Sequence, residues 1–297
     1  MKKMKLHIGL AQLYPKLGEV ETNLQKHLAL IDEALAGGVE LLVFPELSLT
    51  GYSVQDMVSE VALVPSADHP VFGPLVQASH RLDLVVGFVE EESRERFYIS
   101  SAYLSDGQIV HIHRKVYLPT YTLFDEGRYF AWGDGVSAFD TKFRRAGILI
   151  CEDFWHVSPP YLLWLDGADI LILTSASPGR GLGPGDKLNS SRFVELANQA
   201  YASMFGNFVV HTNRVGWEDG INFWGGSSVF DPNGELVAQA PYFEEVLLTV
   251  KVDLGMLRRT RSRLPLLRDE RTALTLREMR RILGEYHEPD IKPSGWS

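Results

Sequence analysis

The chain contains a single cysteine, Cys151, at a place where a thiol could act as a nucleophile. An apolar run at 147–150 precedes it, and Glu152 and Asp153 follow it at once. A thiol at a junction between a strand and a helix is exposed at the edge of a sheet, close to backbone N–H groups that can hold an oxyanion. Most lone cysteines are inert and buried, so the hypothesis of a nucleophile requires a base and a cation nearby.

Two other segments each offer a charged group at the end of a predicted strand. Glu46 follows the apolar run 40–44 and a proline, and its carboxylate could serve as a general base. Lys115 ends the segment 111–115, and its ammonium could stabilise a developing oxyanion. A glutamate or a lysine at a strand end is usually a solvated edge residue, so neither signal is strong alone.

The elements that must position these groups follow from the hydrophobic pattern. Short apolar runs alternate with longer amphipathic stretches, and neither a Pro/Gly/Ser-rich linker nor an internal repeat divides the sequence. We therefore expect one α/β domain in which two mixed sheets pack together with helices outside. The predicted strands are 6–12, 40–44, 84–89, 98–104, 109–113, 145–150, 170–173, 208–211, 227–230, 236–239 and 246–252, and the predicted helices are 22–36, 74–82, 159–165 and 188–205.

The composition indicates a globular protein without a nucleic-acid partner. Of 297 residues, 45% are hydrophobic, and 29 Lys and Arg against 38 Asp and Glu give a net charge of −9, a poor match to phosphate. No apolar run approaches the roughly 18 residues of a membrane span. One cysteine excludes a disulfide framework and a multi-thiolate zinc site, which favours a cytoplasmic location. His111 and His113 alternate along one strand without a third ligand, so we expect packing or surface roles and no metal.

The C-terminal part departs from this acidic balance. Between 258 and 281 there are nine arginines against three acidic residues, a net charge of +6. The sequence predicts a main domain at 1–255 and an Arg-rich C-terminal extension at 256–297, packing on that domain or on a second subunit. An exposed helical face is the simpler alternative.

Three blocks around the charged residues resemble the signature blocks of the nitrilase superfamily of carbon–nitrogen hydrolases, in order and in spacing. The blocks lie at 44–52, 114–119 and 147–153. The resemblance implies a four-layer α-β-β-α sandwich and a carbon–nitrogen hydrolase domain at 1–255. It also implies Glu46 as general base, Lys115 as stabiliser of the tetrahedral intermediate, Cys151 as nucleophile and Glu126 as a second glutamate that orients the lysine. This chemistry needs no metal and no organic cofactor.

The segments 115–130 and 151–155 are more similar to the glutaminase domain of glutamine-dependent NAD synthetases than to nitrile-hydrolysing members. The resemblance implies that Tyr121, Phe124 and Ser177 line the acyl pocket, and that the backbone N–H of Glu152 helps to hold the oxyanion. That branch also carries a cation after the Ser-Pro turn, to pair with the substrate carboxylate. Here no basic residue stands at that position, and the candidates are Arg180 and Lys187.

Several functions stay open at this point. The first is an amidase that cleaves a small linear amide through a Cys151 thioester and releases ammonia. The second is a glutaminase subunit that supplies ammonia to a separate synthetase, since no glycine-rich phosphate loop is seen that could form an acyl-adenylate. A nitrilase and an inactive interaction protein are less favoured. The resemblance also implies a homodimer or larger assembly, because sandwiches of this family associate through the helices that follow the nucleophile, here 158–165 and 188–205. We expect Leu162, Leu163 and Trp164 at the centre of that interface.

Overall fold

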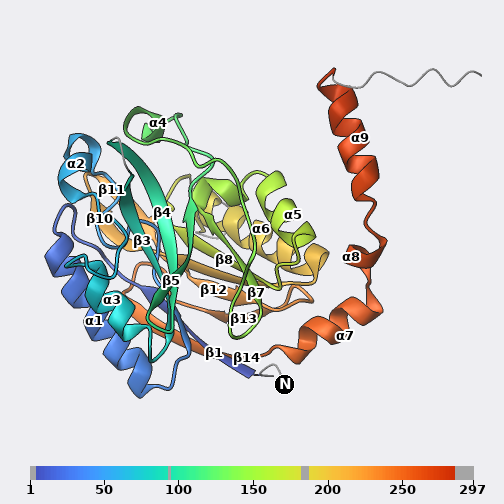
Figure 1. The fold of residues 1–297 in the computed structure, drawn as a ribbon, viewed down its shortest axis with the longest axis horizontal. Coiled ribbons are helices and arrows are strands. Elements are labelled where there is room, and N and C mark those ends of the chain that lie inside the picture. Colours follow the sequence, from blue (N-terminus) through green and yellow to red (C-terminus); the bar gives the residue numbers. More distant parts are fainter. Residues whose placement is uncertain (1–4, 93–94, 182–186, 285–297) are drawn as a thin grey trace, which may run out of the picture.

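Two six-stranded mixed sheets face each other at the centre of the computed structural model, which describes residues 5–92, 95–181 and 187–284 (Figure 1). In the first sheet the strands at 5–12, 41–43 and 83–92 are parallel, and in the second the strands at 145–150, 170–175 and 208–213 are parallel. The first sheet has the order β14 (Val246–Asp253), β1 (Lys5–Gln12), β2 (Leu41–Val43), β3 (Asp83–Glu92), β4 (Arg96–Ser105), β5 (Gln108–Arg114). The second has the order β13 (Leu236–Gln239), β12 (Ser228–Phe230), β9 (Phe208–Asn213), β8 (Ile170–Ser175), β7 (Arg145–Ile150), β6 (Phe139–Asp140).

Helices cover the outer face of each sheet, which completes the four layers. On the first sheet lie α1 (Val20–Ala36) and α3 (Phe72–Ala78), and on the second lie α5 (Ser158–Leu165) and α6 (Asn189–Phe205). Side chains alternate along each strand, so Ile148 and Ile172 fill the space between the sheets while Leu149 and Leu171 pack against the helices. The predicted α-β-β-α sandwich is confirmed.

Smaller elements fill the connections around one end of the sheets. A hairpin of β10 (Val215–Glu218) and β11 (Ile221–Trp224) follows β9, and the sequence pattern did not predict it. Short helical turns form η1 (Gln55–Met57), α2 (Val58–Val61), α4 (Glu126–Tyr129) and η2 (Cys151–Phe154). Of the candidate residues, α4 carries Glu126, and η2 carries Cys151 and Glu152.

The C-terminal extension begins against the domain and then leaves it. In α7 (Gly255–Arg263), Leu257 enters the core between the sheets, and Arg261 pairs with Asp169. The following α8 (Leu266–Asp269) still contacts the helix layer of the second sheet, where Leu267 packs against the hydrophobic cluster beneath α5 and α6. The last helix, α9 (Thr272–Ile282), extends away from the sandwich, and none of its residues is buried (Figure 1). Residues 285–297 of the predicted extension lie outside the described part of the chain.

The predicted centre of a subunit interface is wrong for two of its three residues. Leu163 and Trp164 point into the subunit, where they are 0% and 3% exposed and pack with Leu149 and Phe205. Leu162 alone faces outward, at 49% exposure. The local sequence 162–164 is apolar throughout, so its pattern could not tell the inner face of the helix from the outer one.

No helix in the described ranges is long and apolar enough to cross a bilayer.

Candidate active site

Loops at the carboxyl ends of four strands bring the candidate residues together. Glu46 follows β2, Lys115 follows β5, Cys151 follows β7, and Ala176 follows β8. The carboxyl ends of parallel strands lie at the same edge of a sheet, and the two sheets present these edges side by side. Residues separated by as many as 130 positions therefore touch.

Glu46 is fully buried and has a partner on each oxygen. Its Oε1 accepts a hydrogen bond from Lys115 Nζ at 2.8 Å, and its Oε2 accepts one from the backbone N–H of Ala176 at 2.7 Å. The loop that carries it rests on Gly87 of β3, where a Cβ would lie 2.4 Å from the carbonyl oxygen of Pro45. Only glycine leaves room for the backbone to approach this closely.

Lys115 lies between two carboxylates. Its Nζ is 2.8 Å from Glu46 and 2.8 Å from Glu126, and its side chain is fully buried. Burial lowers the pKa of this ammonium, but the charges of Glu126 and Glu46 outweigh burial and raise the pKa well above its usual value. The lysine is therefore a fixed positive charge inside the protein.

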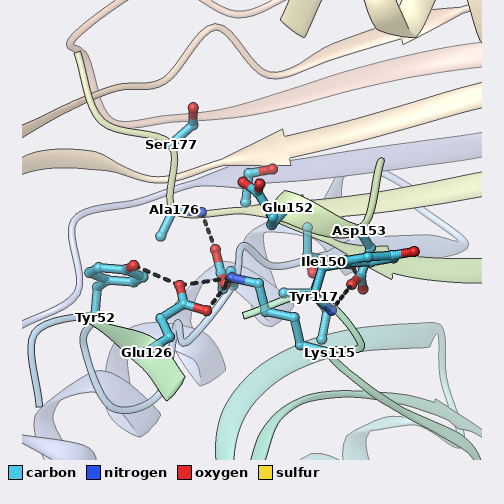
Figure 2. A network of polar contacts seen from close by, with 12 residues as sticks. Tyr52, Lys115, Tyr117, Glu126, Ile150, Glu152, Asp153, Ala176 and Ser177 are labelled. Atoms are coloured by element: carbon cyan, nitrogen blue, oxygen red, sulfur yellow. Dashed lines mark hydrogen bonds and ion pairs between the residues drawn. The ribbon is translucent and has the colours of Figure 1, made fainter. Parts of the chain in front are cut away.

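Glu126 begins α4 and completes the group. Tyr52 donates its hydroxyl to Glu126 Oε1 at 2.6 Å, so the carboxylate is held between Tyr52 and Lys115 (Figure 2). Burial raises the pKa of Glu126 to about 7, against the charge of Lys115 and with that of Glu46. This carboxyl therefore titrates near neutral pH.

Cys151 stands at the tight turn after β7, with a φ of 44°, in the left-handed region that side chains with a Cβ seldom adopt. Burial above all, and then the charge of Glu46, raises the pKa of the thiol well above its usual value, although Lys115 acts in the opposite direction. The thiol is neutral at rest, so attack on a carbonyl requires a base that accepts its proton in the same step.

Aromatic residues lie beside this group. The Phe124 ring meets the rings of Tyr52 and Tyr121 edge to face, with centroids 6.4 and 5.6 Å apart. Tyr121 donates its hydroxyl to both carboxylate oxygens of Glu152 at 3.0 Å, and burial and that carboxylate raise the pKa of Tyr121 to about 12. Ser177 is buried and its backbone N–H donates to Asn213 Oδ1 at 2.9 Å.

The structure separates the two candidate cations. The guanidinium of Arg180 lies 4.9 Å from the centroid of the Phe124 ring and donates to Thr122 Oγ1 at 3.2 Å. Lys187 pairs instead with Glu195 of α6 at 3.0 Å. Arg180 thus belongs to the aromatic cluster, and Lys187 is held by a partner elsewhere. Part of the loop between them, 182–186, lies outside the described residues.

The two histidines have packing partners. His111 stacks on Phe139 with ring centroids 4.3 Å apart, and His113 Nε2 lies 2.8 Å from Asp153 Oδ2. In the described ranges, no group of three or more His, Cys, Asp and Glu side chains is arranged to hold a metal.

The sequence analysis did not predict the contacts that hold the loop carrying Tyr52. Glu218 Oε1 accepts hydrogen bonds from the backbone N–H groups of Tyr52 and Ser53 at 2.8 and 2.7 Å, and its Oε2 accepts one from buried Arg214 at 2.7 Å. Through Glu218, the β10–β11 hairpin is connected to the loop that carries Tyr52. The turn sequence Asp219-Gly220 between two short apolar segments is the hairpin signal that could have revealed it.

Beside Tyr52 and Glu126 a cavity of about 210 Å³ opens. Tyr129 and Phe130 form part of its apolar wall, and Asp125 and Asp219 add carboxylates to its lining.

The fold and this buried arrangement define an α/β sandwich with a thiol beside a Glu–Lys–Glu group. A family model described as carbon-nitrogen hydrolase matches residues 7–262, and the chain belongs to that family. This is the family of carbon–nitrogen hydrolases that the three sequence blocks implied.

Individual relatives agree with this placement. A glutamine-dependent NAD(+) synthetase from Thermotoga maritima is 34% identical over 257 residues, which cover 84% of this chain and 42% of that protein. A carbon-nitrogen hydrolase structure from Helicobacter pylori G27 has a TM-score of 0.81 at 24% identity, covering 91% of this chain and 96% of that one. Nit3 of Saccharomyces cerevisiae, a member of branch 10 of the nitrilase superfamily, has a TM-score of 0.78 at 22% identity, covering 89% and 96%. The two structural likenesses show a shared fold, and the chain spans less than half the length of the synthetase.

Proposed function

We propose that the protein hydrolyses a small linear amide to an acid and ammonia through a thioester on Cys151. The observation that carries the proposal is the buried contact of Lys115 with Glu46 and Glu126 beside the thiol. A fixed cation and a carboxylate around a neutral thiol are what nucleophilic attack on an amide carbonyl requires.

In the first half of the proposed reaction, Glu46 accepts the proton of Cys151 as sulfur attacks the carbonyl carbon. The oxygen becomes an oxyanion, held by Lys115 and by the backbone N–H of Glu152. Glu46 then returns the proton to the amide nitrogen, the carbon–nitrogen bond breaks, and ammonia leaves the thioester. Glu126 keeps Lys115 in place throughout.

In the second half, Glu46 takes a proton from water as the oxygen of water attacks the thioester. The tetrahedral intermediate uses the same oxyanion contacts, the carbon–sulfur bond breaks, and the proton returns to sulfur. The acid leaves and the thiol is restored. The balance is one amide and one water consumed for one acid and one ammonia formed.

The substrate side of the proposal rests on the aromatic cluster. Tyr121, Phe124 and Ser177 are proposed to line the acyl pocket, and Arg180 to pair with an anionic group of the substrate. Arg180 is half-buried against Phe124, and its charge also acts on Tyr121. Truncation in Arg180→Ala should then lower kcat/KM for glutamine and leave an uncharged amide of similar length unaffected. Lys187→Ala serves as the matched control, since Lys187 is paired with Glu195.

The test of the main proposal is ammonia release from a panel of linear amides by the purified chain. Cys151→Ala should abolish release and keep the melting temperature, because one small side chain is lost and no disulfide or metal depends on it. Iodoacetamide should label Cys151, and substrate should protect it. Ammonia release by Cys151→Ala at the wild-type rate would disprove the thioester.

A second candidate function is that of a glutaminase whose ammonia is passed to a separate synthetase. The identity of 34% to the Thermotoga maritima enzyme favours it, and the chain covers only 42% of that enzyme. Glutamine would then be preferred within the amide panel, and a partner synthetase would raise the rate of its hydrolysis. A nitrilase is a third reading, and acid and ammonia from a nitrile at a rate above that for amides would favour it.

A further inference from the structure

The carboxylate of Asp153 joins the two loops that carry Cys151 and Lys115. Asp153 is fully buried and accepts four hydrogen bonds. Its Oδ1 accepts from the backbone N–H groups of Val116 and Tyr117, both at 3.0 Å. Its Oδ2 accepts from the backbone N–H of Ile150 at 2.9 Å and from His113 Nε2 at 2.8 Å.

The donors are the immediate neighbours of the reacting groups. Ile150 comes directly before the nucleophile, and Val116 and Tyr117 come directly after the lysine. Asp153 itself lies two residues after Cys151. Its carboxylate reaches back to Ile150, before the tight turn, and across to Val116, which follows a strand of the other sheet. Thirty-seven residues separate Asp153 from Val116, and this contact fixes the spacing between the two loops.

The turn at Cys151 gives this contact a second effect. The φ of 44° at Cys151 is disfavoured for a residue with a Cβ, so the turn persists only where its surroundings hold it. The bond from the Ile150 N–H to Asp153 closes the turn over Cys151. Without it, the nucleophile is free to relax toward an ordinary backbone conformation.

His113 fixes the orientation of the carboxylate. A carboxylate accepts, so Nε2 of His113 carries the hydrogen in this contact. His113 is 3% exposed at the end of β5, two residues before Lys115. The imidazole therefore ties the end of this strand to the same carboxylate that ties the turn after β7.

We propose that Asp153 and His113 are positioning residues that set the geometry between Cys151 and Lys115. The inference rests on the proposed hydrolysis, but one of its tests, the alkylation of Cys151, needs no substrate. The side chains touch neither sulfur nor the lysine ammonium in this arrangement. They act by holding the backbone on both sides of the reacting pair.

Asp153→Asn is the central variant, because it keeps the shape and changes the hydrogen bonding. An asparagine can accept on one side only, so its NH₂ group must face either the N–H of Ile150 or the two N–H groups of Val116 and Tyr117. We expect kcat to fall by about 10- to 100-fold with KM changed by less than about 3-fold, as for a displacement near 1 Å at a reacting centre.

Asp83→Asn is the matched control. Asp83 is also fully buried, and it accepts from Tyr103 at 2.6 Å and Ser105 at 2.7 Å at the opposite, amino-terminal end of β3. This variant should lower Tm and leave kcat within about 2-fold of wild type, because no reacting group depends on the position. An equal loss of kcat in Asp83→Asn and Asp153→Asn at equal loss of Tm would overturn the inference.

His113→Phe and His113→Gln keep the inference testable if Asp153→Asn does not fold. Phenylalanine removes the donor to Asp153, whereas the amide nitrogen of glutamine can replace Nε2. The kcat should fall in His113→Phe and return to within about 3-fold of wild type in His113→Gln. A His113→Phe variant with the wild-type kcat would contradict a positioning role.

Alkylation of Cys151 by iodoacetamide separates this inference from the proposed function. The rate should differ from wild type in Asp153→Asn and not in Asp83→Asn, because a displaced thiol experiences a different balance of burial, the charge of Glu46 and the charge of Lys115. If the wild type hydrolyses no amide, the proposed function fails, and the alkylation rates still decide the positioning role. Equal alkylation rates in wild type and Asp153→Asn would refute it.

Discussion

The replacement Lys115→Met removes the charge of the lysine and keeps most of its volume. It leaves two carboxylates, Glu46 and Glu126, facing each other at 0% and 5% exposure without a cation between them. Removing one partner of a buried ion pair costs about 3–5 kcal/mol, because an uncompensated charge stays buried. At about 2 °C per kcal/mol for a chain of this size, Tm should fall by roughly 6–10 °C.

The loss should depend on pH in a defined direction. The pKa of Glu126 is already raised to about 7 by burial, and removing Lys115 takes away the charge that opposes this rise. Consider a carboxyl group whose pKa is higher in the folded state than in the unfolded state. At a pH low enough for the group to be protonated in both states, it costs no stability. It costs progressively more as the pH rises past its unfolded pKa toward its folded one. The deficit in Tm of Lys115→Met should therefore be smallest near about pH 5 and largest near about pH 8.

The double variant Lys115→Met, Glu126→Gln is the internal control. It removes one of the two like charges, so part of the lost Tm should return near about pH 8. The kcat should stay low in both variants, by roughly 10²- to 10³-fold, because the oxyanion has lost its cation. Thermal unfolding followed by circular dichroism and ammonia release measure the two effects. A Lys115→Met variant with the wild-type Tm at both pH values would refute the reasoning about the buried charges.

Three further outcomes are expected. Tyr52→Phe removes a hydrogen bond that lowers the pKa of Glu126, so the pKa of this carboxyl in the folded protein should rise above about 7. The loss of stability caused by ionising the buried Glu126 should then continue above about pH 7, and Tm should keep falling there as the pH rises. Gly87→Ala should lower Tm and reduce kcat by about 10²-fold, because its Cβ displaces the loop carrying Glu46, whereas Gly135→Ala has open space and should change neither. Light scattering should show a dimer or larger species, and Leu162→Asp should shift it toward 33.4 kDa; a wild-type monomer at micromolar concentration would contradict the assembly.

The sequence by itself determined the layers of the sandwich and the order of the site. Short apolar runs bounded by turn residues mark the strands, and side chains alternate along each strand, so Ile148 and Leu149 lie on opposite faces of the sheet. The residues Glu46, Lys115 and Cys151 stand at strand ends, and parallel strands place such ends at a common edge. These features are local in the chain or follow from its order, so short segments suffice to predict them.

The tertiary structure decided which groups touch. Lys115 and Glu46 are 69 residues apart, and Glu218 reaches the backbone of Tyr52 across 166 residues. Arg180 and Lys187 stood as equal candidates in one loop, but Arg180 stacks on Phe124 while Lys187 pairs with Glu195. Hydrogen bonds and ring contacts act over a few ångströms, and spacing along the sequence does not encode such distances between remote segments. Packing of the two sheets sets them, and with them the partners of each buried charge.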